Sequence, residues 1–256
     1  MDWAYKAVLT ATTVALLLAV AQVFGRRLAG VLAGLPTVTG PALVWLALDF
    51  GAEYAVEAAI GSVAACVVCA LFAFAYEWTS RFCGIVVTLT TACLVCLLVA
   101  PPLQWLASDL ALALLIAGGA TLAIHAAMPR GRDETTGRPG VPGELLLTAL
   151  ASGAVSGAVA LLAPALGPFW AGVLTSPPLI AAAVAMHQHV SGGSRSIRPF
   201  LRGYVLGLFG RVAFGAGFAV LVVPCGVTAA TLFASAAGCL LTTTALRHGI
   251  QARARD

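Results

Sequence analysis

The tetrapeptide Ala29-Gly30-Val31-Leu32 recurs in this chain as Ala171-Gly172-Val173-Leu174, 142 positions later. At the same offset, without a gap, further identities continue as far as Ala92 and Ala234. They pair Pro36 with Pro178, Gly51 with Gly193, Gly61 with Gly203, Val63 with Val205, Phe72 with Phe214, Cys83 with Cys225, and Gly84 with Gly226. The contiguous tetrapeptide, the shared proline and the matched glycines predict an internal duplication.

Composition sets the class of protein around this repeat. The 256 residues are 61% hydrophobic and 9% charged, and the mean hydropathy is +0.99. A soluble domain of this size has no use for so much apolar surface, so composition predicts an all-α polytopic membrane protein in a lipid bilayer. The net charge of +4 is therefore read as loop orientation, and no nucleic-acid partner is expected. The seven cysteines lie in apolar runs, unlike a secreted disulfide framework.

Apolar runs of about 18–26 residues predict nine membrane spans. They lie at about 4–24, 28–49, 53–78, 83–100, 107–128, 144–163, 168–190, 200–223 and 226–246. One long polar connection, from Pro129 to Gly143, is rich in Arg, Gly and Pro and is predicted to be an exposed loop. The first run resembles a signal peptide that ends in Ala19-Val20-Ala21, but it aligns with the sixth span, and this favours a retained helix.

The duplication divides the chain into three parts. Shifting spans one to four by 142 positions places them on spans six to nine and leaves the fifth span as a linker. The predicted parts are repeat 1 (1–102), a linker span with a cytoplasmic loop (103–143) and repeat 2 (144–256). Because four helices and one linker precede the second repeat, it begins on the opposite side of the membrane. The prediction is two inverted four-helix repeats, a plan that many secondary transporters use.

The distribution of arginines gives an independent orientation. With the N-terminus outside and the C-terminus in the cytoplasm, twelve arginines face the cytoplasm, only Lys6 faces outward, and Arg211 falls within a span. The twelve are Arg26, Arg27, Arg81, Arg130, Arg132, Arg138, Arg195, Arg198, Arg202, Arg247, Arg253 and Arg255. This positive-inside bias predicts a multi-pass protein of a bacterial-type inner (plasma) membrane with that topology.

Both repeats carry prolines near the middle of an apolar span. Proline removes a backbone donor and clashes with the preceding turn, and in lipid the freed carbonyls must find partners in protein, water or a ligand. Under inverted symmetry the two breaks face each other near the bilayer centre, which predicts a substrate site there. Its predicted residues are Pro36, Thr37 and Thr39 from the second span and Thr175, Ser176 and Pro178 from the seventh. The alternative is a pair of ordinary proline kinks.

Arg211 lies near the middle of the eighth predicted span. A charge at this depth is costly and usually faces a cavity or a partner. Because Glu77 and Glu144 lie near cytoplasmic ends, no acidic partner is expected at that depth, and an anionic substrate is one candidate. Snorkelling, pairing with a backbone carbonyl and a misplaced span boundary are the alternatives.

Two cysteine pairs offer a different chemistry. Cys66 and Cys69 share one helical face, and Cys93 and Cys96 share a face of the next span, so four thiols could bind a soft metal such as Cu(I). The second repeat lacks both pairs, and cysteine is also a small apolar filler. His187 and His189, two residues apart on a helix, do not face each other and make a poor metal site.

The segment from Lys6 to about Trp78 resembles the GlpM-like family of small bacterial inner-membrane proteins. The resemblance rests on an apolar first helix, the run Leu28-Ala29-Gly30-Val31-Leu32, the pair Pro36-Thr37 and a turn from Gly51 to Glu57. Members of that family look like a single half of this chain. The resemblance therefore implies a fused, inverted pair here and carries over neither a substrate nor a site.

The leading hypothesis is a secondary transporter of a small anionic or lipid-linked substrate, without a cofactor, that uses the two broken helices as a central site. An intramembrane enzyme or a soft-metal or thiol redox protein is the second hypothesis, and a non-transporting membrane scaffold is the third. The sequence leaves open the substrate, the transport direction, a coupling ion and a homodimer.

Overall fold

The computed structural model describes residues 25–129, 163–176 and 178–253, together with seven isolated positions at 8, 11, 12, 15, 16, 150 and 154. Every element in these ranges is a helix. The predicted first and sixth spans, nearly all of the long polar connection and Pro177 lie outside the described residues.

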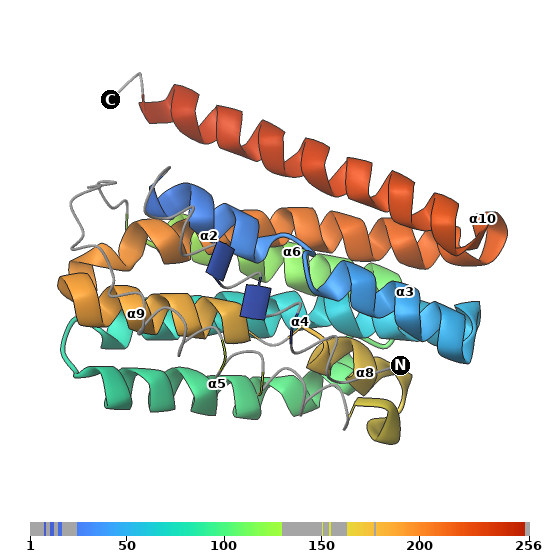
Figure 1. The fold of residues 1–256 in the computed structure, drawn as a ribbon, viewed down its shortest axis with the longest axis horizontal. Helices are drawn as coiled ribbons and strands as arrows, with labels where there is room; N and C mark the ends of the chain where they lie inside the picture. The colour runs from blue at the N-terminus through green and yellow to red at the C-terminus, as the bar shows by residue number, and fades with distance from the viewer. Residues whose placement is uncertain are drawn as a thin grey trace.

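The described helices run roughly along one common axis, except for the last segment, which leaves the bundle at an angle (Figure 1). In chain order they are α2 (Arg26–Gly34), α3 (Thr39–Phe50), α4 (Ala52–Thr79), α5 (Ile85–Leu106), α6 (Leu110–Ala127), the 3-10 turn η1 (Ala163–Leu166), α8 (Pro168–Leu174), α9 (Leu179–Ser196) and α10 (Arg198–Arg253).

Six stretches of the described chain are long and apolar enough to cross a membrane. They are Arg26–Phe50, Ala52–Thr79, Ile85–Leu106, Leu110–Ala127, Pro168–Ser196 and Arg198–Leu246. These stretches cover the predicted spans two to five, seven, and eight joined to nine. The all-helical, membrane-type character of the chain is thus confirmed, whereas the number nine and the repeat arrangement stay predictions.

The longest helix, α10, reverses direction within its length. Gly226 takes φ 77 and ψ 166, outside the helical region, and Pro224 stands two residues before it. Figure 1 shows the chain doubling back there, so that α10 consists of an inner segment before Gly226 and an outer segment after it. Glycine adopts a positive φ at little cost, and proline disfavours the continuous helix. The turn coincides with the predicted boundary between 223 and 226.

One predicted boundary differs from the structure. The fourth span was expected to end at about residue 100, before Pro101 and Pro102, but α5 continues through both prolines to Leu106. Each proline costs one backbone hydrogen bond, yet the helix continues for about one further turn, and Ala107 N donates to Leu103 O at 2.8 Å. A new helix then begins at Leu110, where the carboxylate of Asp109 accepts from Leu112 N at 2.9 Å as an N-cap.

The centre of the bundle is formed by α4 and the inner segment of α10, which pack against each other. Two short helices lie against this pair at glycines that leave no room for a side chain. A Cβ on Gly30 of α2 would lie less than 3.0 Å from the backbone of Phe200 in α10, and a Cβ on Gly172 of α8 would lie equally close to Ala58 in α4. Small residues permit such close backbone approach in membrane helices.

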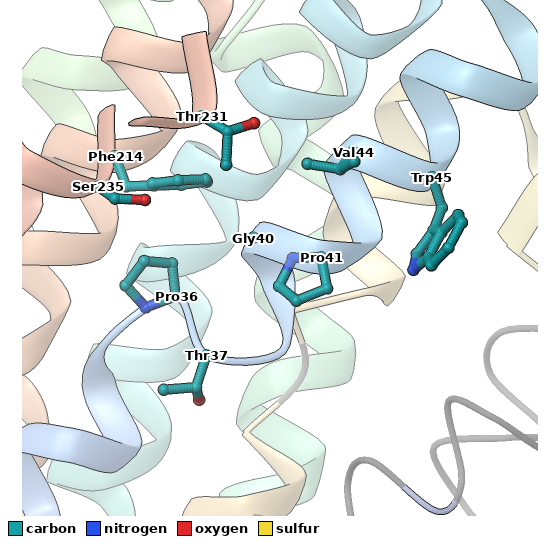
Figure 2. Close-up of a pocket in the computed structure, with 9 residues that line it drawn as sticks. All are labelled: Pro36, Thr37, Gly40, Pro41, Val44, Trp45, Phe214, Thr231 and Ser235. Atoms are coloured by element: carbon teal, nitrogen blue, oxygen red, sulfur yellow. The ribbon is translucent and has the colours of Figure 1, made fainter. Parts of the chain in front are cut away.

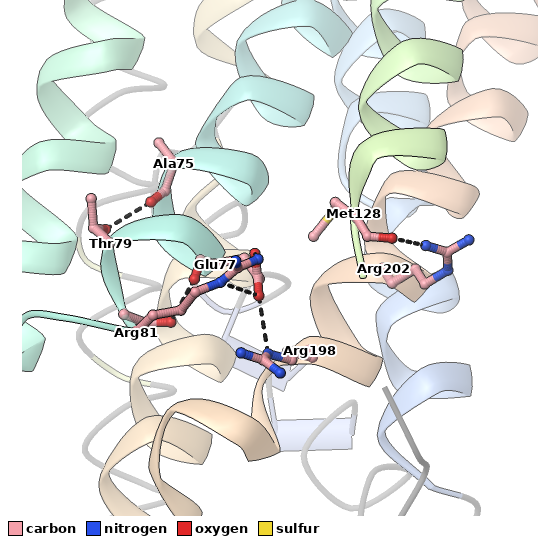
Figure 3. A network of polar contacts seen from close by, with 8 residues as sticks. Ala75, Glu77, Thr79, Arg81, Met128, Arg198 and Arg202 are labelled. Carbon is pink, nitrogen blue, oxygen red and sulfur yellow. Dashed lines mark hydrogen bonds and ion pairs between the residues drawn. The ribbon is translucent and has the colours of Figure 1, made fainter. Parts of the chain in front are cut away.

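Several arginines lie at the end of the bundle where α4 ends and α2 begins. The buried carboxylate of Glu77, at the end of α4, accepts from Arg81 Nε at 3.1 Å and pairs with Arg198 Nε at 3.0 Å (Figure 3). Arg202 donates to the carbonyl of Met128 at the end of α6. These interactions hold α4, α6 and α10 together. The start of α2 lies at the same end, where Arg27 contacts Gly203.

Candidate functional site

The first interruption separates α2 from α3 at residues 35–38. Leu35 leaves the helix with ψ 161, and its N–H is shared between the carbonyls of Val31 and Leu32. Pro36 has no N–H to donate to Leu32, so the helical ladder cannot continue. The chain re-enters a helix at Thr39, and Gly40 N donates to Pro36 O at 2.8 Å. The carbonyls of Ala33 and Gly34, which end α2, are left without the usual intrahelical partners.

The second interruption separates α8 from α9. Here α8 ends at Leu174, and α9 begins at Leu179 with Pro178 as its N-cap residue. Thr175 closes the end of α8, since its Oγ1 donates to Gly172 O at 3.0 Å and its N–H donates to Ala171 O. Ser176 N donates to Val173 O at 3.1 Å, and the carbonyl of Ser176 accepts from a side chain of another helix, the Cys69 thiol.

Arg211 joins the two interruptions. Its side chain is buried, with 7% exposure, and it reaches from the inner segment of α10 to the ends of α2 and α8. Its Nε donates to Gly34 O at 3.2 Å, and its Nη2 lies 3.3 Å from Ala33 O and 3.4 Å from Leu35 O. Its Nη1 lies 3.5 Å from Ser176 O and 3.7 Å from Cys69 Sγ.

These contacts use the whole hydrogen-bonding capacity of the guanidinium group, which has five N–H donors. Both ion pairs in the described part of the chain belong to Glu77, so the positive charge of Arg211 is balanced there by carbonyl dipoles and not by a carboxylate. Among the alternatives raised by the sequence, the structure therefore shows pairing with backbone carbonyls. In this conformation Arg211 offers no spare donor to a substrate.

A short chain of hydroxyl groups links α3, α4 and the residue Ser176 after α8, beside Arg211. Thr39 Oγ1 and Ser176 Oγ lie 3.2 Å apart, and Ser176 Oγ donates to Ser62 Oγ at 3.1 Å. All three residues are buried. The Cys69 thiol adds a contact of 3.2 Å to Ser176 O. Ser176 is thus the polar centre where α3, α4 and α8 meet.

Two residues of this cluster were missed by the sequence analysis. Ser62 is a small polar residue in a mostly apolar span, and such a residue by itself is a weak signal of a site. Tyr204 is almost fully buried, and its hydroxyl lies beside Cys69 and Arg211. An aromatic residue in a membrane span is too common to single out by sequence.

A pocket of about 370 Å³ opens next to the first interruption (Figure 2). Its walls come from the start of α3 and from both segments of α10. Most of the lining is apolar, and its side-chain hydroxyls are those of Thr37, Thr231 and Ser235. The remaining lining residues are Pro36, Gly40, Pro41, Val44, Trp45 and Phe214.

The predicted site residues therefore divide into two neighbouring groups. Thr39, Ser176 and Arg211 come together in the buried cluster, whereas Pro36 and Thr37 line the pocket. Thr175 is engaged with its own helix, and Pro178 begins α9. The groups are adjacent, because the carbonyl of Leu35 contacts Arg211 and the next residue, Pro36, lines the pocket.

The four cysteines of the soft-metal alternative are not gathered into one group in the described structure. Cys66 and Cys69 are buried and Cys96 is partly buried, but Cys93 is exposed on the outer face of α5. Cys66 Sγ is 3.6 Å from Ser62 O, and Cys96 Sγ is 3.9 Å from Val68 O. Within the described ranges, no group of three or more His, Cys, Asp or Glu side chains is placed to hold a metal ion.

One of the two histidines of α9, His189, contacts α4. His189 Nδ1 lies 3.4 Å from the hydroxyl of Tyr76, and the two rings meet edge to face. The side-chain amide of Gln188, between the histidines, is buried without a hydrogen-bond partner in the described structure.

Comparison with known proteins adds no relative, since no protein-family model, curated protein or solved structure matches this chain. The function is therefore argued from the site itself.

Proposed function

We propose that this chain is a membrane transporter of the inverted-repeat secondary type, which moves a small anionic or lipid-linked substrate past the crossing of the two interrupted helices. The observation that carries this proposal is the meeting of both interruptions, one from each half of the chain, on the buried Arg211. Interrupted backbone at membrane depth survives where it is buried in protein or lines a cavity, and secondary transporters place their sites at such paired breaks.

An inverted duplication accounts for contacts that recur at the offset of 142. The close approach of Gly30 to Phe200 corresponds to that of Gly172 to Ala58, with both members of the pair shifted by the same offset. Likewise, the approach of Gly203 to Arg27 corresponds to that of Gly61 to Phe169.

Four of the five glycines with positive φ in the described structure pair at this offset, whereas Gly226, with φ 77, has the counterpart Gly84 with φ −69. Gly25 and Gly167 have φ of 94 and 91, and Gly51 and Gly193 have φ of 95 and 72. Matched turns at matched positions are expected when two halves of a chain share one fold.

The centre of the site supports the same symmetry. Arg211 and Cys69 are 142 positions apart, and their side chains touch. Gly34 and Ser176, whose carbonyls both accept from Arg211, are also counterparts at this offset. Counterpart residues meet each other only near a two-fold pseudo-axis, so we place that axis at the arginine.

The pocket beside this centre is the proposed substrate entrance. Its volume of about 370 Å³ is within the range of small-molecule sites, which combine an apolar lining with a few polar groups. Arg211 contacts the carbonyl of Leu35, and the next residue, Pro36, lines the pocket. The positive charge of Arg211 would therefore attract an anionic group into the pocket while its N–H donors remain on the carbonyls. Thr37 and Ser235 offer hydroxyls for hydrogen bonds, and the apolar lining suits a lipid-linked portion.

The orientation of the proposed transporter follows from the arginine-rich end of the bundle. Arg26, Arg81, Arg198 and Arg202 belong to this end, and the positive-inside rule assigns such an end to the cytoplasm. The proposed topology has the N-terminus outside and the C-terminus inside a bacterial-type inner membrane.

A ligand-stabilisation experiment tests the substrate proposal. Purified protein would be heated in detergent with a panel of inorganic, carboxylate and phosphate anions, including lipid phosphates, and the hits would be assayed for flux in proteoliposomes. Ser235→Leu fills the pocket from α10, whereas Ala237→Leu adds the same side chain at an exposed position of the same segment. We expect stabilisation and flux in the wild type and in Ala237→Leu, and neither in Ser235→Leu. A panel without any stabilising anion would count against the proposal.

A swap of counterpart residues tests the inverted repeat separately. If the pseudo-axis lies between positions 69 and 211, an arginine placed at 69 should reach the counterpart carbonyls from the other half, and this set shares Gly34 and Ser176 with that of Arg211. The double variant Cys69→Arg/Arg211→Cys should therefore unfold at a higher temperature than Arg211→Cys alone. A double variant no more stable than the single one would remove the symmetry argument.

A further inference from the structure

The carbonyl oxygens around Arg211 are grouped as the ligands of a cation site would be. Three belong to consecutive residues at the end of α2, namely Ala33, Gly34 and Leu35, and the fourth belongs to Ser176 just after α8. The last carbonyls of a helix carry partial negative charge, because the peptide dipoles align along the axis. Two helix ends therefore direct negative potential at one buried point.

In secondary transporters, unwound carbonyls and helix C-terminal ends commonly hold a sodium ion or a proton-carrying group. In this chain the same kind of acceptor set is filled by a side chain. All five N–H donors of Arg211 point at protein acceptors, which are four carbonyls and the Cys69 sulfur. The guanidinium group is planar and permanently charged, and its five donors spread over acceptors on two helices.

We infer that the crossing of the interrupted helices is a carbonyl cation site whose occupant is the Arg211 guanidinium, a tethered replacement for a coupling ion. The cation site itself stands on the contacts above. Its consequence for coupling rests on the proposed transport function: no metal ion binds at the crossing, and transport at this site is independent of a sodium gradient. Arg211 then holds α2 and α8 to α10 throughout, and substrate binds beside it in the pocket.

Chemical rescue tests this inference. Arg211→Ala removes the guanidinium and leaves a space that ethylguanidinium can fill. We expect the variant to unfold about 10 °C lower than the wild type, because four buried carbonyls lose their partner. Millimolar ethylguanidinium should restore at least half of that loss, with saturation, whereas ethylammonium, which lacks the planar fork of donors, should restore less. Arg202→Ala is the matched control, since it removes an arginine from the same helix at the end of the bundle, and ethylguanidinium should not shift it.

A second measurement uses the unaltered protein and decides the matter even when Arg211→Ala does not fold. The unfolding temperature of the wild type is measured in sodium, lithium and potassium chloride and in the chloride of N-methylglucamine at equal ionic strength. We expect no difference between these salts. A saturable increase with sodium, or an Arg211→Ala protein that folds but ignores ethylguanidinium, would overturn the cation-site inference.

The outcomes for the two proposals are distinguishable. Anion-stimulated stabilisation blocked by Ser235→Leu would support transport even when rescue fails. Rescue of Arg211→Ala without any anion response would leave the carbonyl site intact and remove the transport function.

Discussion

The contact between α8 and α4 allows a sharp prediction about Gly172. A Cβ built on Gly172 would fall less than 3.0 Å from three backbone atoms of Ala58, a separation that real Cβ atoms do not show. Because backbone atoms cannot turn aside as a flexible side chain can, Gly172→Ala must push the two helices apart by about 1 Å, an overpacking strain that typically costs about 1–3 kcal/mol. Ser176 lies one turn later on the same segment, so the displacement would also disturb the hydroxyl contacts with Ser62 and Thr39.

The higher helix propensity of alanine opposes this overpacking strain and reduces the net destabilisation. Alanine is favoured over glycine inside a helix by about 1 kcal/mol. The overpacking strain and the lost hydroxyl contacts together exceed this gain, so we expect a net destabilisation of about 1–2 kcal/mol. In a chain of this size, that corresponds to a fall in the unfolding temperature of about 2–8 °C.

The chain offers matched controls for this substitution. Gly118 and Gly119 lie in α6, and a Cβ on either would meet no atom within 4 Å. Alanine at these positions should leave the unfolding temperature unchanged or raise it. Gly30, the counterpart of Gly172, should respond to alanine as Gly172 does, because its Cβ would meet the backbone of Phe200 in the same way. Thermal unfolding in detergent gives the unfolding temperatures of the four purified alanine variants. A Gly172→Ala protein as stable as Gly118→Ala would refute the packing argument.

Three further outcomes are expected. Glu77→Gln removes the buried carboxylate that holds Arg81 and Arg198 and should cost about 2–4 kcal/mol in unfolding free energy; a double-mutant cycle with Arg198→Gln should show coupling, and simple additivity would contradict it. Asp109→Ala deletes the N-cap of α6 and should cost about 0.5–2 kcal/mol, with Asp109→Asn close to the wild type; equal unfolding temperatures for the alanine and asparagine variants would argue against the cap. A water-soluble maleimide should label the exposed Cys83 in the folded protein, and the buried Cys66 and Cys69 only after denaturation; peptide mass spectrometry reads each site, and native labelling of Cys69 would show that the crossing opens to water.

Much of the helical layout could be predicted because membrane helices are encoded by two strong signals. Apolar length marks the spans, and glycine and proline mark their ends, as at Gly51 and Gly226. The extension of α5 through Pro101 and Pro102 could not be predicted in this way. A proline pair predicts a boundary, but whether a helix resumes beyond it depends on neighbouring contacts that the local sequence does not specify.

The centre of the site was predictable only in part. The cost of a buried charge singled out Arg211, and the loss of backbone donors singled out the two interruptions. The partners of Arg211 could not be read from the sequence, because every residue has a carbonyl and an acceptor of this kind leaves no trace in residue type. The offset of 142 did contain a usable signal, since it pairs Arg211 with Cys69 and so pairs the charge with the cysteine that it touches.

The difference between Arg211 and its counterpart Cys69 follows from the geometry of the crossing. At a two-fold pseudo-axis, counterpart residues share one small space, and four carbonyls and the Cys69 sulfur already contact a single guanidinium there. A second arginine at position 69 would bring two like charges together in a buried site, where repulsion is strong. A dimer of identical halves could place either no arginine or two at its axis. A fused pair can place one charge opposite one small thiol. On the proposed inverted-repeat architecture, this need for a single central cation gives a physical reason for joining two halves in one chain.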